Sequence, residues 1–272
     1  MKPTADEDEE IPLSGGNVSG TVRAGDTVRR RTGPWTPAVH ALLRHLEAAG
    51  FEGAPRALGF DAKGREVLTY LSGEAGSMMP MPAYMWSDEA LVAAARLVRR
   101  CHDAVASVAP PAAARWRVQV GAPADGEIIC HNDLAPWNTV YRPVAGYDGG
   151  LPSGLIDWDF AAPGSRLWDV ADAVWRFVPY YEDWKCRIVG LDEPPDYARR
   201  TRLFCDAYGL DDRSALLDTV RRRQQVLSDT IRAWGGAGEP GFAELLRLGY
   251  DKLPLQDLRL LESRWDEIAA AL

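Results

Sequence analysis

Residues 130–140 read Cys130-His131-Asn132-Asp133-Leu134-Ala135-Pro136-Trp137-Asn138-Thr139-Val140, and residues 155–160 read Leu155-Ile156-Asp157-Trp158-Asp159-Phe160. The first stretch is a polar loop between two short apolar segments, and the second has an aspartate that leaves an apolar strand. Asp and Asn are common turn residues, so either stretch alone could be a simple connection. The two together, in this order and each at a strand end, favour a functional site.

The polar residues of these stretches fit the tasks of a phosphoryl-transfer centre. A His-x-Asp, an Asn five residues after that Asp, and a later aspartate at a strand end follow the order of a kinase catalytic loop and its metal-binding aspartate. Asp133 is then the base that takes a proton from an acceptor hydroxyl. Asn138 and Asp157 supply a neutral and a charged oxygen to Mg²⁺. We interpret His131 as a structural residue of the loop.

On these residues the chain resembles the aminoglycoside phosphotransferase-like enzymes, small-molecule relatives of protein kinases whose loop typically reads His-Gly-Asp-x-x-x-x-Asn. The segments 156–161 and 164–171 resemble the same family, in which an Asp commonly begins the helix after the metal-binding strand. The resemblance is specific over about residues 127 to 175. The sequence differs from common members at Ala135, where a histidine is frequent.

The resemblance implies a bilobal α+β fold of the protein-kinase type. A small sheet-containing, nucleotide-binding lobe would span residues 1–71, with 1–10 as a disordered acidic tail, and a larger, mostly helical catalytic and substrate-binding lobe would span 72–272. The implied activity is ATP- and Mg²⁺-dependent phosphorylation of a small-molecule hydroxyl, with GTP as an alternative donor. An aminoglycoside or other antibiotic is the leading acceptor. The alternatives are a metabolic kinase for choline, a sugar or an amino alcohol, and a nucleotide-binding pseudoenzyme.

The nucleotide contacts that the resemblance implies lie in the small lobe. The glycine-rich turn around Asn17 could cover phosphates, although a plain hairpin turn has a similar composition. The strand at 27–31 has no lysine, so the phosphate-binding role would fall to an arginine, and alternation from Val28 favours Arg30. Backbone groups from Thr69 to Leu71 are the candidates for the adenine edge.

The helix expected from Thr36, with Pro37 in its first turn, to Gly50 lacks the glutamate that related enzymes place near its beginning. Val39 and His40 occupy that region, so the family's ion pair is expected to be missing. His40 could reach the site or simply pack. The absence of both lysine and glutamate favours the pseudoenzyme alternative, while Asp133, Asn138 and Asp157 oppose it.

The larger lobe is predicted from helical spacing to be a series of helices. Carboxylates of this lobe hold substrate ammonium groups in the family, and several are available here. We interpret Asp169 as a structural partner of the loop, Asp172 as solvated or capping, and His102 as structural. Aromatic residues are dense in the same region and could either wall an acceptor pocket or pack the core: Trp137, Trp158, Trp168, Trp175, Tyr180, Tyr181 and Trp184.

Composition narrows the class of protein. The chain has 272 residues, a formal net charge of −8 and a pI near 5.1, which argues against a general nucleic-acid binder and is compatible with a cationic acceptor. The dense aromatic residues are compatible with an aromatic-ring-containing acceptor. Its four cysteines are widely separated, which indicates a reducing compartment and a cytoplasmic location. The sequence has no apolar run near the ~20 residues of a membrane span, so no membrane association is expected, and it leaves the oligomeric state open.

Overall fold

The computed structural model describes residues 9–13, 20–76, 79–108, 113–118 and 128–272. Its N-terminal part is an antiparallel sheet with the strand order β1-β2-β3-β5-β4. The strands are β1 (Glu10–Pro12), β2 (Val22–Ala24), β3 (Thr27–Arg30), β4 (Ala57–Phe60) and β5 (Glu66–Thr69). The turn between β4 and β5 forms because the Asp61 carboxylate accepts from the N–H groups of Lys63 and Arg65.

Helix α1 (Thr36–Ala48) connects β3 to β4. The helix begins at Thr36, but Trp35 rather than Thr36 is its N-cap, and the Thr36 hydroxyl accepts from the Gly33 N–H at 2.9 Å. The chain turns away from the helix axis at Gly50, whose φ of +72° lies in the left-handed region that glycine adopts without strain. The leucines of its inner face are fully buried: Leu42, Leu43 and Leu46.

Two small sheets position the central loop, which we define as residues 131–138. β7 (Ile128–Cys130) leads into this loop and pairs with β10 (Ala162–Gly164), while β8 (Thr139–Pro143) leaves it and pairs with β6 (Glu74–Ala75) and β9 (Gly150–Leu155). Because β9 is antiparallel to β8 and ends at Leu155, the chain returns to the loop just before Asp157. The two stretches that the sequence analysis singled out therefore meet.

The remaining elements of the described chain are mostly helices, as the apolar spacing predicts. The C-terminal segment forms two helices that meet at Arg264. The helices are α2 (Asp88–Val105), α3 (Arg166–Phe177), α4 (Asp183–Val189), α5 (Tyr197–Tyr208), α6 (Leu216–Gly236), α7 (Phe242–Arg247), α8 (Leu253–Ser263) and α9 (Trp265–Ala271), with 3₁₀ turns η1 (Ala83–Trp86), η2 (Pro136–Asn138), η3 (Trp158–Phe160) and η4 (Tyr250–Lys252).

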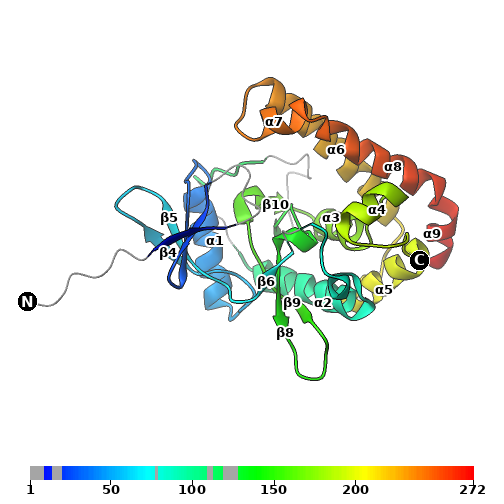
Figure 1. Ribbon diagram of the computed structural model, residues 1–272, viewed down its shortest axis with the longest axis horizontal. Helices are drawn as coiled ribbons and strands as arrows, with labels where there is room; N and C mark the ends of the chain where they lie inside the picture. The colour runs from blue at the N-terminus through cyan, green and yellow to red at the C-terminus, as the bar shows by residue number, and fades with distance from the viewer. Residues whose placement is uncertain (1–8, 14–19, 77–78, 109–112, 119–127) are drawn as a thin grey trace, which may run out of the picture.

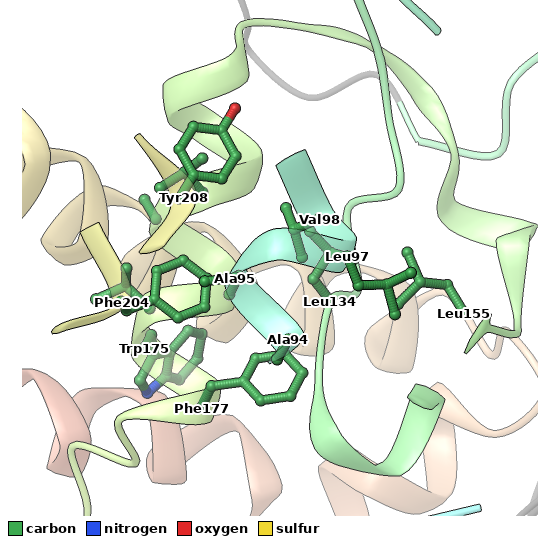
Figure 2. Packing of buried hydrophobic residues seen from close by; sticks show 14 of the residues in the cluster. Ala94, Ala95, Leu97, Val98, Leu134, Leu155, Trp175, Phe177, Phe204 and Tyr208 are labelled. Carbon is green, nitrogen blue, oxygen red and sulfur yellow. The ribbon is translucent and has the colours of Figure 1, made fainter. Parts of the chain in front are cut away.

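Helix α2 is the centre of the large core. It begins at the N-cap Ser87, whose hydroxyl accepts from the Ala90 N–H as its position before the helix predicts. Figure 2 shows Leu134 of the central loop beside Leu97 of α2, and Phe204 of α5 beside Ala95. These side chains are at most 1% exposed, so the central loop is anchored by burial of its own leucine in the core.

The elements form a small sheet-containing part and a larger helical part, which lie side by side along the long axis of the molecule (Figure 1). This is the α+β, kinase-like architecture expected from the resemblance, whereas the lobe boundary after Leu71 stays a prediction. All four cysteines lie in the described ranges, are buried, and form no disulfide with one another. None of the helices in the described ranges is long and apolar enough to cross a membrane.

Candidate active site

Asp169, in the first turn of α3, holds the start of the central loop. Its two carboxylate oxygens accept from the backbone N–H groups of His131 at 2.7 Å and Asn132 at 2.8 Å, and His102 contacts it at 3.1 Å. Burial on its own would raise the pKa of Asp169, but these hydrogen bonds hold the pKa below its usual value. Asp169 is thus a structural partner of the loop. His102, which also contacts the Tyr208 hydroxyl, supports Asp169 from behind.

His131 has a structural place inside the same loop. Its ring is buried against Trp158, its Nδ1 accepts from the Asp133 N–H, and its Nε2 lies 3.1 Å from the Ile156 carbonyl oxygen. These partners require the ring proton on Nε2. His131 therefore ties the central loop to the strand end that precedes Asp157.

Asp133 lies beside Asn138 at the wall of a large cavity. The Asn138 Nδ2 donates to the Asp133 carboxylate at 2.7 Å and to the Asp133 carbonyl at 3.0 Å, which fixes the carboxylate relative to the loop. Burial raises the pKa of Asp133, and the nearby Asp172 and Asp157 raise it further, against the opposing effect of Arg176. A carboxylate with a raised pKa is a stronger proton acceptor than an ordinary aspartate.

Asn138 and Asp157 offer a pair of hard oxygen donors. The Asn138 carbonyl accepts from the Ile156 N–H at 2.9 Å, which brings the two residues together, and the Asn138 amide oxygen remains after Nδ2 is engaged by Asp133. In the described part of the chain no group of three acidic, histidine or cysteine side chains forms a metal cluster. These two donors nevertheless suit Mg²⁺, which keeps waters and substrate phosphates as its other ligands.

Asp157 has a left-handed backbone, with a φ of +63°, and its side chain is 47% exposed. A non-glycine residue in this region stores about 1–3 kcal/mol of strain, which is most often found at functional positions. Its carboxylate faces the guanidinium of Arg30, whose NH1 is 2.9 Å away. The strained backbone therefore occurs at a residue whose side chain contacts a charged partner at the cavity wall.

Arg30, which strand alternation favoured for phosphate binding, is the buried arginine of β3, and its role toward phosphate stays a prediction. Its Nε donates to Glu66 at 2.5 Å, NH1 to Asp157 and NH2 to Asp159 at 2.6 Å. Burial alone would lower the pKa of Arg30, but these three carboxylates raise it, so the guanidinium stays charged. Arg29, by contrast, lies on the other side of the strand, where its nearest acidic partner is Glu10 at 4.0 Å.

The expectation of a missing ion pair is corrected by Glu66. Glu66 lies directly opposite Arg30 in the register of β3 and β5, is 1% exposed, and has its second oxygen 2.9 Å from His40 Nε2 on α1. Strand β5 thus supplies the carboxylate that α1 lacks. His40 is the residue by which α1 contacts this carboxylate. A charged residue at the start of the otherwise apolar segment 66–71 was the sequence signal, but its partner depended on the strand register.

The other predicted nucleotide contacts fall into three situations. Asn17 lies outside the described residues. Thr69 lines the cavity, but its N–H is engaged by the Arg56 carbonyl at 3.0 Å and its hydroxyl by the Arg56 N–H at 2.8 Å. Leu71 lines the same cavity beyond the end of β5. Leu71 is therefore the better candidate for a backbone contact to a base.

Asp172 corrects a second expectation, because it is neither solvated nor a cap. Its side chain is fully buried, accepts from the Leu134 N–H at 3.1 Å and pairs with Arg223 of α6 at 2.8 Å. Arg223 also donates to the Asn132 carbonyl at 2.9 Å. Neither Arg223 nor Arg176 could be found from the sequence, because Arg223 reaches α3 and the central loop from the distant helix α6, and Arg176 of α3 reaches Asp133 of that loop.

The cavity has a volume of about 1280 Å³ and runs from β3 and β5 to α6, α7 and α8. A typical small-molecule pocket measures roughly 300–1,000 Å³, so this cavity is large enough for a nucleotide and an acceptor together. Of the aromatic residues named as candidates for a pocket wall, four line it: Trp137, Trp175, Tyr181 and Trp184. Trp158, Trp168 and Tyr180 are buried in the core instead.

Comparisons with solved structures define the class of fold. A choline/ethanolamine kinase family protein from Mesorhizobium loti superimposes with a TM-score of 0.58, at 17% identity over 100% of this chain and 94% of that chain. The GDP complex of an aminoglycoside 2′-phosphotransferase-IIIa superimposes with a TM-score of 0.53, at 14% identity over 96% and 94% of the two chains. The protein thus has the fold of kinase-like small-molecule phosphotransferases.

Sequence comparison gives the family. The profile described as the phosphotransferase enzyme family matches residues 83–203. The trifolitoxin immunity protein of Rhizobium leguminosarum bv. trifolii is 41% identical over 206 residues, which cover 74% of this chain and 75% of that protein. The chain belongs to the phosphotransferase enzyme family, and the resemblance stated from residues 127 to 175 is confirmed.

Proposed function

We propose that this protein transfers the γ-phosphoryl group of ATP, or of GTP, to a hydroxyl of a small-molecule antibiotic. The observation that carries the proposal is the group of Asp133, Asn138 and Asp157 at the wall of one cavity, with Asp133 fixed by the Asn138 amide at 2.7 Å. The relative named as an immunity protein supports an antibiotic as the acceptor class. The expected lack of an ion pair favoured a pseudoenzyme, and the pair formed by Arg30 and Glu66 weakens that alternative.

The reaction follows from the positions of these side chains. The acceptor oxygen forms a bond to the γ-phosphorus, the bond from that phosphorus to the bridging oxygen of the leaving diphosphate breaks, and Asp133 takes the hydroxyl proton. Arg176, with NH2 4.0 Å from the Asp133 carboxylate, favours the ionised form of Asp133, which is the form that accepts a proton. Arg30, when it is not held by Asp157, has the fork of donors that binds phosphate oxygens.

Asn138 and Asp157 would hold Mg²⁺, which neutralises phosphate charge when it is bound. The chain's own contribution is to fix these two oxygens next to Asp133 through the Ile156 N–H and the Asn138 amide. The backbone of Leu71 would contact the base of the nucleotide at the opposite end of the cavity. Asn17 and Thr69 stay candidates of the same nucleotide half.

The test is Asp133→Asn in the full chain, with nucleotide binding measured by calorimetry and transfer measured by mass detection of a phosphorylated acceptor across a panel of antibiotics. Loss of a general base is expected to slow transfer by about 10²–10⁴-fold, with nucleotide affinity unchanged. Asp192→Asn, at an exposed position, is the matched control. Transfer by Asp133→Asn at the wild-type rate would contradict the base role, and wild-type protein that binds no nucleotide would contradict the proposed function.

A further inference from the structure

The cavity has a charge balance unlike that of the whole chain. Although the chain has a net charge of −8, the described residues that line the cavity include five cationic and five anionic side chains. The acidic surplus therefore lies elsewhere. A site for a polyammonium compound would instead need an excess of carboxylates that face the ligand.

Two carboxylates line the cavity from helices of the larger part, and both already have cationic partners. Asp172 pairs with Arg223 at 2.8 Å, and Asp257 pairs with Lys185 at 2.6 Å and accepts from Trp175 Nε1 at 3.0 Å. Both aspartates are at most 1% exposed. A substrate ammonium could bind either one only by displacing the resident cation, which would leave that cation buried without a partner.

Three aromatic rings of the cavity wall are paired with cations of the chain in the same way. Lys185 Nζ lies 3.7 Å from the centre of the Tyr181 ring, and the Arg176 guanidinium lies 4.3 Å from that of Trp175 and 5.0 Å from that of Trp137. An aromatic cage binds a quaternary ammonium through open ring faces. Here cations of the chain itself already lie over these rings.

The surface that remains for an acceptor is apolar. Helix α6 lines the cavity with Val226, Leu227, Thr230, Ile231 and Trp234, whose spacing places them on one helix face. Ile188 of α4 also lines the cavity. These side chains can bury the rings of a ligand but offer no charge to pair with it.

Resting on the proposed function, we propose that the acceptor is an uncharged molecule with apolar or aromatic rings around its reacting hydroxyl. Polyamino sugars and quaternary amines are disfavoured, because Asp172, Asp257 and three rings that would receive their charge already pair with cations of the protein. These rings are Trp137, Trp175 and Tyr181. Lys185 and Arg176 are thus specificity-determining residues that act by occupying ammonium subsites.

The first test measures binding by tryptophan fluorescence and calorimetry, with the nucleotide-loaded full chain. The probes are matched pairs of neutral aryl glucosides and their 2-amino-2-deoxy counterparts, with choline and a polyamino sugar. Neutral members should bind at least about tenfold more tightly than their amines. Equal or tighter binding of the amines overturns the proposal. Neutral ligands that bind but receive no phosphate would overturn the proposed function, while the preference of the cavity for uncharged ligands would still hold.

The second test asks whether Lys185 occupies an ammonium subsite. It tests the proposal even if no glucoside binds. In Lys185→Ala, n-butylammonium should bind at least about tenfold more tightly than in the wild type, because Asp257 and the Tyr181 ring lose their cation. Lys185→Ala/Asp257→Asn, which has no unpaired carboxylate, should show no such gain, and Arg259→Ala controls for loss of an exposed cation on α8. Equal n-butylammonium affinity in Lys185→Ala and wild type overturns the proposal.

Discussion

Asn132 carries the central loop through a backbone conformation that most side chains avoid, with a φ of +64°. Related loops typically have glycine at this point, and asparagine is among the few other residues that enter this region. Its side chain adds a bond that glycine lacks, because Nδ2 donates to the Phe160 carbonyl at 3.0 Å. The residue therefore joins the loop to the segment after Asp157.

This conformation gives a stability prediction for two substitutions. Asn132→Ala should lower the free energy of unfolding by about 1–3 kcal/mol, since alanine bears the left-handed strain and loses the bond to Phe160. Asn132→Gly loses the bond but not the permitted φ, so its loss should be smaller. Denaturant unfolding of both variants checks the order, and equal losses would show that the conformation is not a source of strain.

Arg176 lowers the pKa of Asp133, which gives a prediction for the pH profile. Burial raises the pKa of Asp133 and Arg176 lowers it, so Arg176→Gln should raise it further. Because a general base accepts a proton only when it is ionised, the acid limb of kcat/KM should move to higher pH in Arg176→Gln if Asp133 is that base. Arg259→Gln, at an exposed site, should leave the limb in place. An acid limb that does not move would mean that Asp133 is not the group that titrates.

At the scale of elements, the pairing of β3 with β5 supplies the carboxylate that pairs with Arg30. In related enzymes a helix glutamate is placed to form the corresponding ion pair. Arg30 and Glu66 are direct cross-strand neighbours, and α1 contributes His40 to the same carboxylate. Cross-strand partners are close only when the register is held, and the turn at Asp61 holds it. The geometry of the nucleotide half thus depends on a hairpin as well as on a helix.

Glu66→Gln tests this arrangement. A hydrogen bond to a charged group contributes about 1.5–3 kcal/mol, so if the pair orients Arg30 toward phosphate, nucleotide affinity should fall roughly tenfold or more. Calorimetric titration with nucleotide measures the change, and Glu52→Gln, an exposed position near the end of α1, is the matched control. Unchanged affinity in Glu66→Gln would separate Glu66 from nucleotide binding.

At the scale of the whole molecule, Arg30 bridges the two parts. It extends from β3 of the small sheet to Asp157 and Asp159, which precede α3 of the helical part. Arg117 also lies 3.6 Å from Asp159, so this junction holds two cations and several carboxylates. The small sheet is therefore tied to the rest of the molecule across the cavity as well as through the chain.

The bridge gives a prediction for hydrogen exchange. Arg30→Gln should increase amide exchange in β3 and β5, whose packing on the rest of the molecule depends on this junction, while exchange in α2 and α5 stays as in the wild type. Arg31→Gln, at the next and exposed position, should change neither. An increase spread equally over all four elements would indicate general destabilisation rather than a bridge between two parts.

The sequence alone determined the fold class, the family and the order of the central residues. Asp133, Asn138 and Asp157 could be named because their spacing within two short segments is local, and most helices could be predicted from local periodicity. Asp169 followed from the same family pattern. The roles of these residues in catalysis stay predictions, with a geometry that supports them.

Only the tertiary structure decided which charges face one another. Glu66 reaches Arg30 through strand register, Asp172 reaches Arg223 through the packing of α3 on α6, and Lys185 reaches Asp257 through the position of α4 beside α8. Such pairs join residues distant in sequence, and a shift of one residue in register or a turn of a helix would change every partner. The residues proposed for transfer could therefore be named from the sequence, whereas our proposal of an uncharged acceptor required the folded cavity.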